Sequence, residues 1–176
     1  VTSLSERARG PMITVALDTS ILSWFARANR LDTLEHLLTG MQAVTTREVL
    51  DELRNGVEAF PALASVLQLG WLAEVRLSGL PAMSIFGEYC RRLGSGQDGN
   101  VGEATVLAWA EVNDAVAVID EKAGRQAAKE RRVRVKGSLW LLAHGITTGI
   151  LSLQQASLIV DELRDAGAYL PCNGGT

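Results

Sequence analysis

The stretch Ile13-Thr14-Val15-Ala16-Leu17-Asp18-Thr19-Ser20 decides how the rest of this chain is organised. Its first five residues, 13–17, are β-branched or aliphatic and predict a short strand that is buried on both faces. Asp18 follows directly, at the point where open α/β sheets place their ligand crevice. Asp18 is therefore either a ligand-binding acid or only a cap or turn residue, and we expect Ser20 to cap the next helix. Other carboxylates at the same edge would decide between these two interpretations.

The composition indicates one globular domain. The chain has 176 residues, of which 47% are hydrophobic and 21% charged, so it can bury a sizeable core and shows no sign of disorder. The net charge of −3 gives no overall positive field, so nucleic-acid binding would depend on local basic patches. Cys90 and Cys172 lack metal-site spacing, which favours a reducing, cytoplasmic location and two passive thiols.

The two ends of the chain are polar and are left out of the fold prediction. Residues 1–11 lack the apolar segment of a signal peptide, so we interpret them as a leader or an expression remnant. No apolar run approaches the roughly 18 residues that span a bilayer, so we expect no membrane partner. We therefore predict one domain over residues 12–171 and a tail over 172–176.

Strand and helix patterns alternate along the whole domain. The predicted strands cover residues 13–17, 42–45, 71–75, 115–119 and 133–135. The predicted helices cover residues 21–28, 31–38, 47–54, 82–93, 102–112 and 122–131, with two more that begin at residues 139 and 152. This alternation predicts an α/β fold, a three-layer α/β/α sandwich with a mainly parallel central sheet.

Carboxylates from separate segments are predicted to meet at one edge of that sheet. The buried strands 13–17 and 115–119 end in Asp18 and Asp120, and parallel strands bring both ends to the same edge. Glu103 lies in the first turn of the helix that precedes the second of these strands. If that helix runs back antiparallel to the sheet, Glu103 reaches this edge as well, where the helix dipole favours a negative charge.

A fourth acid comes from the helix over residues 47–54. Its apolar residues define a buried face, and Glu52 lies nearer that face than Glu48 or Asp51. Four carboxylates that converge repel one another unless cations neutralise them. Oxygen ligands of this kind suit Mg²⁺ or Mn²⁺, and such a site can hydrolyse phosphodiester bonds.

At these residues the sequence resembles the PIN domains. The likeness runs from about Met12 to Pro171 and keeps the order and separation of four acidic motifs. The third motif is similar to the branch in which Gly-Glu-Ala replaces the more usual Asp, and the run Ile-Asp-x-x-Ala-Gly-Arg at 119–125 also belongs to that branch. The four motifs in this sequence are Leu17-Asp18-Thr19-Ser20, Val49-Leu50-Asp51-Glu52-Leu53, Gly102-Glu103-Ala104 and Val118-Ile119-Asp120-Glu121.

The resemblance implies a PIN-like nuclease domain that hydrolyses RNA with Mg²⁺ or Mn²⁺. Many small prokaryotic members are toxins of toxin–antitoxin pairs, so the candidate partners are an RNA substrate, a protein antitoxin and a second copy of the chain in a homodimer. Glu121 stands where a second Asp is frequent, and its role stays open. The implied catalytic acids are Asp18, Glu52, Glu103 and Asp120, and the implied metal shell is Asp18, Glu103, Asp120 and Ser20.

Basic residues recur at helical spacing just after Asp120. A solvated helix face is one interpretation of this stripe, and contact with RNA phosphates is the other. Arg91 and Arg92 leave the same two interpretations open. The stripe consists of Lys122, Arg125, Lys129 and Arg132.

Other signals receive a structural interpretation. The glycine-rich run at 94–99 matches a nucleotide-binding pattern in letters only, because a helix and not a strand precedes it, so we expect a loop in which Asp98 is solvent-exposed. His36 and His144 lie among apolar neighbours and are expected to pack in the core. Trp109 and Trp140 are also expected to be core residues.

Two other functions stay open beside the nuclease. The first is a PIN-like module that binds RNA but has lost efficient catalysis, which the presence of all four acids disfavours. The second is a receiver-like or phosphoryl-transfer protein with Asp18 as the acceptor. Receivers use an early acid pair and a late lysine that are not evident here, and the haloacid-dehalogenase pattern needs Asp where Ser20 stands.

Overall fold

A five-stranded, all-parallel sheet runs through the centre of the computed structural model, which describes residues 12–94 and 100–170. The order of the strands is β3-β2-β1-β4-β5, which confirms the predicted α/β fold with a parallel sheet. The leader, the tail, Cys172 and Asp98 lie outside the described residues. The strands are β1 (Thr14–Leu17), β2 (Gln42–Thr46), β3 (Ala73–Val75), β4 (Val116–Val118) and β5 (Val135–Lys136).

The strand order reverses between β1 and β4. β1 is followed by β2 and β3 on one side, whereas β4 and β5 extend the sheet on the other. The register pairs Leu17 of β1 with Val118 of β4, so the two strands end level with each other. Such a switch point leaves a crevice beyond the carboxyl ends of the strands, because the flanking connections turn to opposite faces. Asp18 is the first residue after β1 at this crevice.

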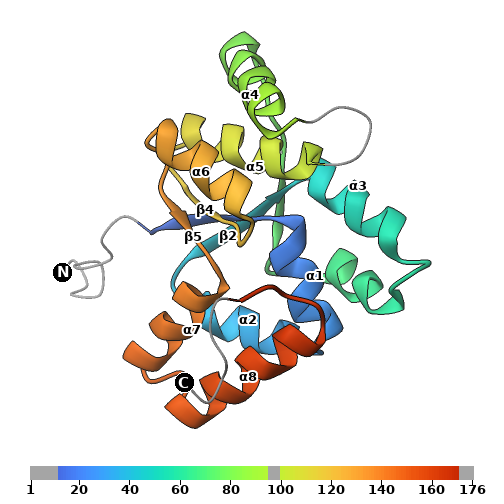
Figure 1. The fold of residues 1–176 in the computed structure, drawn as a ribbon, viewed down its shortest axis with the longest axis vertical. Coiled ribbons are helices and arrows are strands. Elements are labelled where there is room, and N and C mark those ends of the chain that lie inside the picture. The colour runs from blue at the N-terminus through green and yellow to red at the C-terminus, as the bar shows by residue number, and fades with distance from the viewer. Residues whose placement is uncertain (1–11, 95–99, 171–176) are drawn as a thin grey trace, which may run out of the picture.

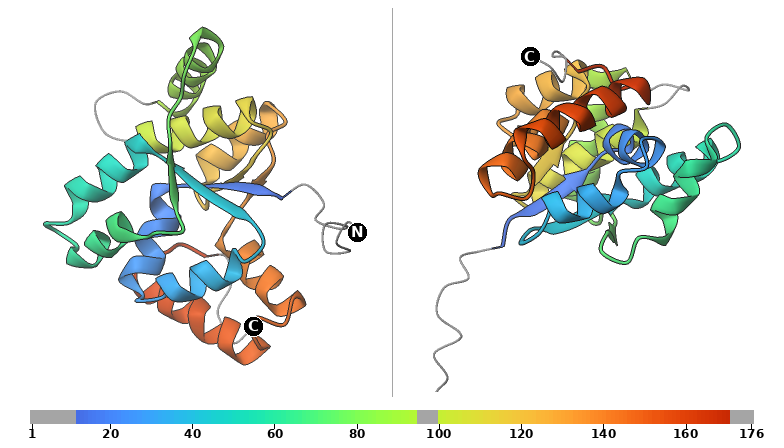
Figure 2. Two further views of the ribbon diagram at one scale, coloured as in Figure 1. Left: turned by 180° about the vertical axis from the view of Figure 1, so that it is seen from behind. Right: turned by 90° about the horizontal axis from the view of Figure 1, so that it is seen from below.

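Helices cover both faces of the sheet (Figure 1). One layer holds α4 (Leu80–Leu93), α5 (Val101–Val112) and α6 (Lys122–Glu130), and the views in Figure 2 place the other layer across the sheet from it. The helix α3 (Arg47–Gly56) and the 3₁₀ helix η1 (Pro61–Gln68) pack against α1, and α3 also packs against α5. The second layer holds α1 (Thr19–Arg27), α2 (Leu31–Leu37), α7 (Ser138–Thr147) and α8 (Leu153–Asp165).

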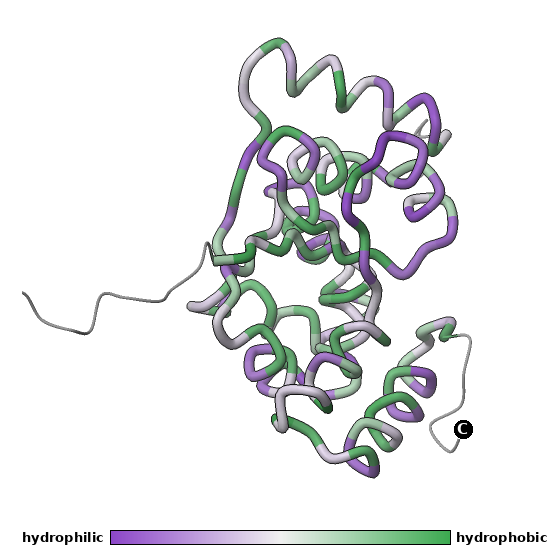
Figure 3. Tube along the Cα trace, turned by 90° about the vertical axis from the view of Figure 1, so that its left-hand side faces the viewer, coloured by the Kyte–Doolittle hydropathy of each residue, from purple (hydrophilic) through white to green (hydrophobic). Residues whose placement is uncertain are grey.

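The core is built around β1 and α5. Val15, Ala16 and Leu17 are completely buried, because both layers of helices cover this central strand. In α5 the residues from Gly102 to Ala108 are all buried. Figure 3 shows hydrophobic residues along the central strands and hydrophilic ones mainly on the helices around them. Within the described ranges, no helix is both long and apolar enough to cross a bilayer.

All five predicted strands differ from the structure at one or both ends; those predicted at 42–45 and 115–119 are Gln42–Thr46 and Val116–Val118. Ile13 precedes β1 and is 48% exposed, because it lies beyond the cover of the helices. The prediction for 71–75 is right only from Ala73 onwards. The strand predicted at 133–135 begins at Val135, because the N–H of Val133 instead donates to Ala128 O (2.8 Å) and closes the end of α6.

The predicted caps are partly confirmed. Ser152 and Gln155 form the expected capping box at the start of α8. The prediction that Ser20 caps the first helix is wrong: Asp18 is the N-cap residue of α1, and its side chain accepts from the backbone N–H of Ser20. The carboxylate of Asp18, the residue just before the helix, satisfies this free N–H.

The two histidines differ from the expectation that both pack in the core. His36 is exposed, because it lies on the outer face of α2. His144 is half-buried and stacks on Trp140, with ring centroids 5.6 Å apart. Trp109 and Trp140 are half-buried against the core, as expected for packing residues.

Candidate active site

A hollow of about 300 Å³ lies beyond the carboxyl end of β1. We call it the acid hollow. It contains Asp18, Glu52 and Glu103, three of the four predicted acids, and also Glu121. Asp120 does not line it. The complete lining is Asp18, Thr19, Ser20, Ser23, Trp24, Glu52, Asn100, Glu103 and Glu121.

Asp18 is buried with half of its carboxylate unbonded. Asp18 is only 4% exposed. Oδ2 accepts from the backbone N–H of Ser20 (3.3 Å) and from its hydroxyl (2.8 Å), whereas Oδ1 has no hydrogen-bond partner in the part of the chain that the structure describes. Burial raises the pKa of Asp18 to about 6, although the bonds from Ser20 oppose the shift. Asp18 is thus the cap residue of α1 and is also buried, whereas its interpretation as a ligand-binding acid stays a prediction.

Glu103 is the most perturbed acid of the hollow. It lies in the first turn of α5, is 4% exposed, and neither carboxylate oxygen has a hydrogen-bond partner among the described residues. Burial raises its pKa to about 8, and the charges of Asp18, Glu121 and Glu52 add to the shift. A Cβ at Gly124 would lie 2.0 Å from Oε1, so only glycine allows α6 to approach this carboxylate.

Glu52 is held by hydrogen bonds on both oxygens. Oε1 accepts from the backbone N–H of Gly102 (2.7 Å), and Oε2 accepts from the Thr19 hydroxyl (2.5 Å). A Cβ at Gly102 would lie 2.5 Å from Oε2, so this glycine admits the carboxylate to the start of α5. These bonds join α3 to α1 and α5. They hold the side chain of Glu52 so that it points towards the acid hollow, as the helix pattern predicted.

Asp120 and Glu121 leave β4 in different directions. Asp120 is half-buried, and its two oxygens accept from the backbone N–H (2.8 Å) and the hydroxyl (2.6 Å) of Ser138. Glu121 is exposed and lines the acid hollow. The structure therefore brings Asp18, Glu52 and Glu103 together as predicted, with Glu121 beside them. Asp120 does not line this hollow but lines the neighbouring groove.

The acids of the hollow suit a hard divalent cation, although the described residues form no complete group of metal ligands. Within residues 12–94 and 100–170, none of the four predicted acids forms an ion pair, and no three His, Cys, Asp or Glu side chains are arranged to hold a metal. Buried polar atoms normally have partners, so the three bare oxygens of Asp18 and Glu103 need one. Carboxylate oxygens of this kind fit Mg²⁺ or Mn²⁺.

A larger groove of about 950 Å³ adjoins the acid hollow. We call it the basic groove. It shares Ser20, Trp24 and Glu121 with the hollow, and Asp120 also lines it. In the described part of the chain, none of the four cations of the predicted stripe forms an ion pair. The remaining lining residues are Lys122, Arg125, Gln126, Lys129, Arg132, Val133, Val135, Gly167 and Tyr169.

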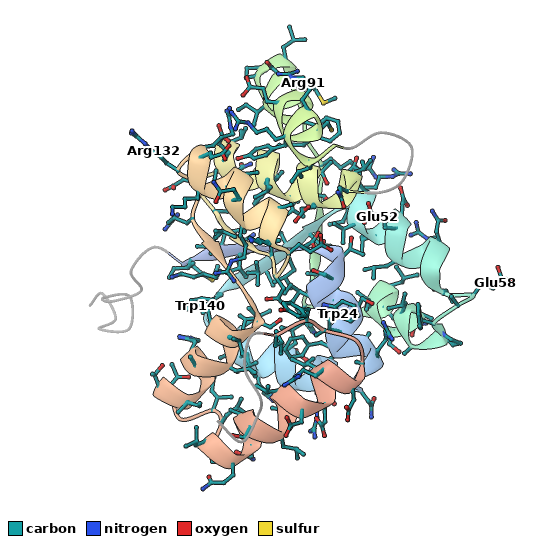
Figure 4. All side chains as sticks on the ribbon, viewed as in Figure 1. Trp24, Glu52, Glu58, Arg91, Arg132 and Trp140 are labelled. Carbon is teal, nitrogen blue, oxygen red and sulfur yellow. The ribbon has the colours of Figure 1, made fainter. Side chains whose placement is uncertain are left out.

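Two aromatic residues, Trp24 and Tyr169, line the basic groove, whereas Arg91 and Arg92 lie outside it. Tyr169 is 92% exposed in the basic groove, and the guanidinium of Arg27 lies 5.3 Å from the ring of Trp24. Figure 4 labels Trp24 and Glu52 within the body of the domain, and Arg132 pointing outward. Arg91 and Arg92 line a separate hollow on α4 with Glu88, so they do not join the basic groove.

The sequence analysis did not single out Ser138, Thr19 or Gly124. Thr19 and Ser138 act on acids far along the chain, which no local pattern reports. Gly124 is part of the motif at 119–125. A glycine inside a motif is a signal that the backbone approaches another group closely, which here is the carboxylate of Glu103.

Most of the chain is similar to proteins of known fold. A family model described as a PIN domain matches residues 14–173. No curated protein matches the chain. Among solved structures, VapBC2 from Rickettsia felis, bound to a DNA fragment from their promoter, aligns with a TM-score of 0.52 and 20% sequence identity. The alignment covers 71% of this chain and 98% of that chain, and it supports the fold.

Proposed function

The chain belongs to the PIN-domain family, and we propose that it is a metal-dependent endoribonuclease that hydrolyses phosphodiester bonds of RNA. The observation that carries this proposal is the pair of buried acids Asp18 and Glu103, whose three bare oxygens share one hollow. Unpaired buried carboxylates are costly, and proteins retain such groups mainly where they bind or react. A purely structural site would have paired them with hydrogen-bond donors or with a cation of the chain.

Mg²⁺ or Mn²⁺ is the cofactor that these residues fit. Asp18 and Glu103 would hold it, with Glu52 and Asp120 as the further acids and Ser20 fixing the carboxylate of Asp18. When bound, such an ion activates water and stabilises negative charge on the phosphate. The hydrogen bonds from Thr19 and Gly102 keep Glu52 oriented towards the hollow, so this side chain needs no large movement to contribute.

The basic groove provides the route for the substrate. Four cations that form no ion pair with any described residue line it, and it shares lining residues with the acid hollow. Phosphates of a nucleic acid lying in this groove would replace the missing ionic partners. We therefore assign RNA-phosphate contacts to Lys122, Arg125 and Lys129. Arg91 and Arg92 line a separate hollow, and Arg92 is paired with Glu130.

We further propose that the chain is the toxin of a toxin–antitoxin pair and acts in the cytoplasm. One solved structure of similar fold is VapBC2 from Rickettsia felis, and the groove beside the acids offers a surface that an inhibitory protein could cover. Co-expression with the product of an adjacent reading frame tests this. Inhibition of RNA cleavage by that product supports the toxin role, and cleavage that is unaffected contradicts it.

A second candidate is a PIN-like module that binds RNA without efficient cleavage. The observation that favours it is the lack of a complete metal-ligand group in the described ranges. A panel of single-stranded and hairpin RNAs, incubated with Mg²⁺, with Mn²⁺ or with a chelator, decides between the two. We expect metal-dependent cleavage that Asp18→Asn and Glu103→Gln abolish, whereas the exposed Glu58→Gln control stays active. Binding without cleavage in every metal would favour the second candidate.

A further inference from the structure

Ser138 holds the carboxylate of Asp120 at two points. Its backbone N–H donates to Oδ1 (2.8 Å) and its hydroxyl donates to Oδ2 (2.6 Å). Two bonds to different oxygens fix both the position and the plane of a carboxylate, which one bond cannot do. Ser138 has no exposed surface, so the surrounding packing restricts its own movement.

The start of α7 is shaped to receive this carboxylate. Gly137 precedes the helix, and a Cβ on it would lie 2.5 Å from Oδ1 of Asp120. Any other side chain at this position would push the acid away. The helix begins regularly, with Trp140 and Leu141 donating to Gly137 O (3.0 and 3.3 Å), and so presents its free N–H groups and positive end to Asp120.

The register of the sheet brings Ser138 to this place. The N–H of Ile119 donates to Lys136 O (2.8 Å), which continues the pairing of β4 with β5 to the residues just before Asp120 and Gly137. Since β4 and β5 end level with each other, the first turn of α7 lies beside Asp120, two residues after the end of β4. A slip of one residue in this pairing would separate the two groups.

The neighbouring acid is held in a similar way. The backbone N–H and hydroxyl of Ser20, in the first turn of α1, both donate to Oδ2 of Asp18. The two strands at the switch point therefore each end in an aspartate that a serine of a helix N-terminus orients. The two pairs of hydrogen bonds differ. Among the described residues, Oδ1 of Asp18 has no hydrogen-bond partner, whereas both carboxylate oxygens of Asp120 accept a bond.

We propose that Ser138 is a positioning residue for Asp120, with Gly137 providing the space for this pair of hydrogen bonds. This role rests on the proposed function, because it concerns how a carboxylate of the metal site is oriented. Outer groups that bond to a ligating carboxylate typically change metal affinity or activity about 10- to 100-fold when removed. The remaining lone pairs of Asp120 stay available, since each ionised carboxylate can accept about four bonds.

The test compares Ser138→Ala with a serine that caps a helix far from the acids. Ser152→Ala removes the capping box of α8 and serves as the matched control, because it also deletes one helix-start hydroxyl. Isothermal titration calorimetry gives the Mn²⁺ affinity of each variant, and RNA cleavage assays give its kcat and KM. We expect Ser138→Ala to lose about 10-fold in Mn²⁺ affinity and 10- to 100-fold in kcat with little change in KM, and Ser138→Thr to recover most of both.

The outcomes separate this inference from the proposed function. If the parent protein binds Mn²⁺ and cleaves RNA but Ser138→Ala behaves like Ser152→Ala, Ser138 has only a structural role and the inference is overturned. If the parent neither binds Mn²⁺ nor cleaves RNA, the proposed function fails and the inference fails with it. Circular dichroism melts show that each variant is folded, and Gly137→Ala, which displaces Asp120 while leaving the Ser138 hydroxyl, should lower Mn²⁺ affinity in the same direction.

Discussion

Replacing Glu103 with glutamine should stabilise the metal-free protein at neutral and alkaline pH. The pKa of Glu103 rises from an ordinary 4.5 to about 8, mainly because burial disfavours its charge. A difference of about 3.5 pKa units at about 1.4 kcal/mol each means that ionisation of this group lowers the free energy of unfolding by at most about 5 kcal/mol. The neutral glutamine avoids this cost, and we expect a gain of about 2–4 kcal/mol at pH 8.5.

The sign follows from proton linkage. Below pH 4.5 Glu103 is protonated in the folded and the unfolded protein alike, so the substitution changes little there. As the pH rises towards 8 the unfolded state releases its proton first, and the parent protein loses stability that the variant keeps. The difference should therefore grow between pH 4.5 and about 8 and stay constant above it.

Urea denaturation in the presence of a chelator, from pH 5 to pH 9, measures this difference. Glu58→Gln is the matched control, because Glu58 is exposed and projects away from the domain (Figure 4). Adding Mg²⁺ should reverse the order, since the cation stabilises the parent through a carboxylate that the variant lacks. A difference between Glu103→Gln and the parent that does not change with pH would refute the argument.

Three further predictions concern the same site. Asp18→Asn should abolish metal-dependent RNA cleavage and leave the circular dichroism spectrum unchanged; cleavage at the parent rate would remove Asp18 from the mechanism. The double variant Lys122→Ala/Arg125→Ala should weaken RNA binding and reduce its salt slope by about 0.7 for each lost single-strand contact, and an unchanged slope would assign the stripe to a solvated face. Gly124→Ala should lower the melting temperature and Mn²⁺ affinity together, because the new Cβ would lie 2.0 Å from Oε1 of Glu103, and a variant equal to the parent in both would contradict the close approach.

Local patterns predicted most of the secondary structure and three members of the acid hollow. Alternation of apolar strands with amphipathic helices gave the parallel sheet, and the helix pattern at 47–54 turned Glu52 inward, where the structure has it. Two of the errors came at helix ends, where local hydrogen bonds outweigh the preference for a strand or for a serine cap. The N–H of Val133 donates to Ala128 O and ends α6, so Val133 does not belong to a strand. Asp18, and not Ser20, caps α1.

The sequence by itself determined the α/β fold, the capping box at Ser152 and the arrival of Asp18 and Asp120 at one edge of the sheet. These features depend on hydrophobic periodicity and short-range hydrogen bonds, both of which are written in neighbouring residues. Only the tertiary structure decided that Glu121 faces the acid hollow while Asp120 turns to Ser138, 18 residues further along the chain. Periodicity tells on which face of its own element a side chain lies, whereas its partners across elements depend on strand register and helix packing, which the complete fold alone fixes.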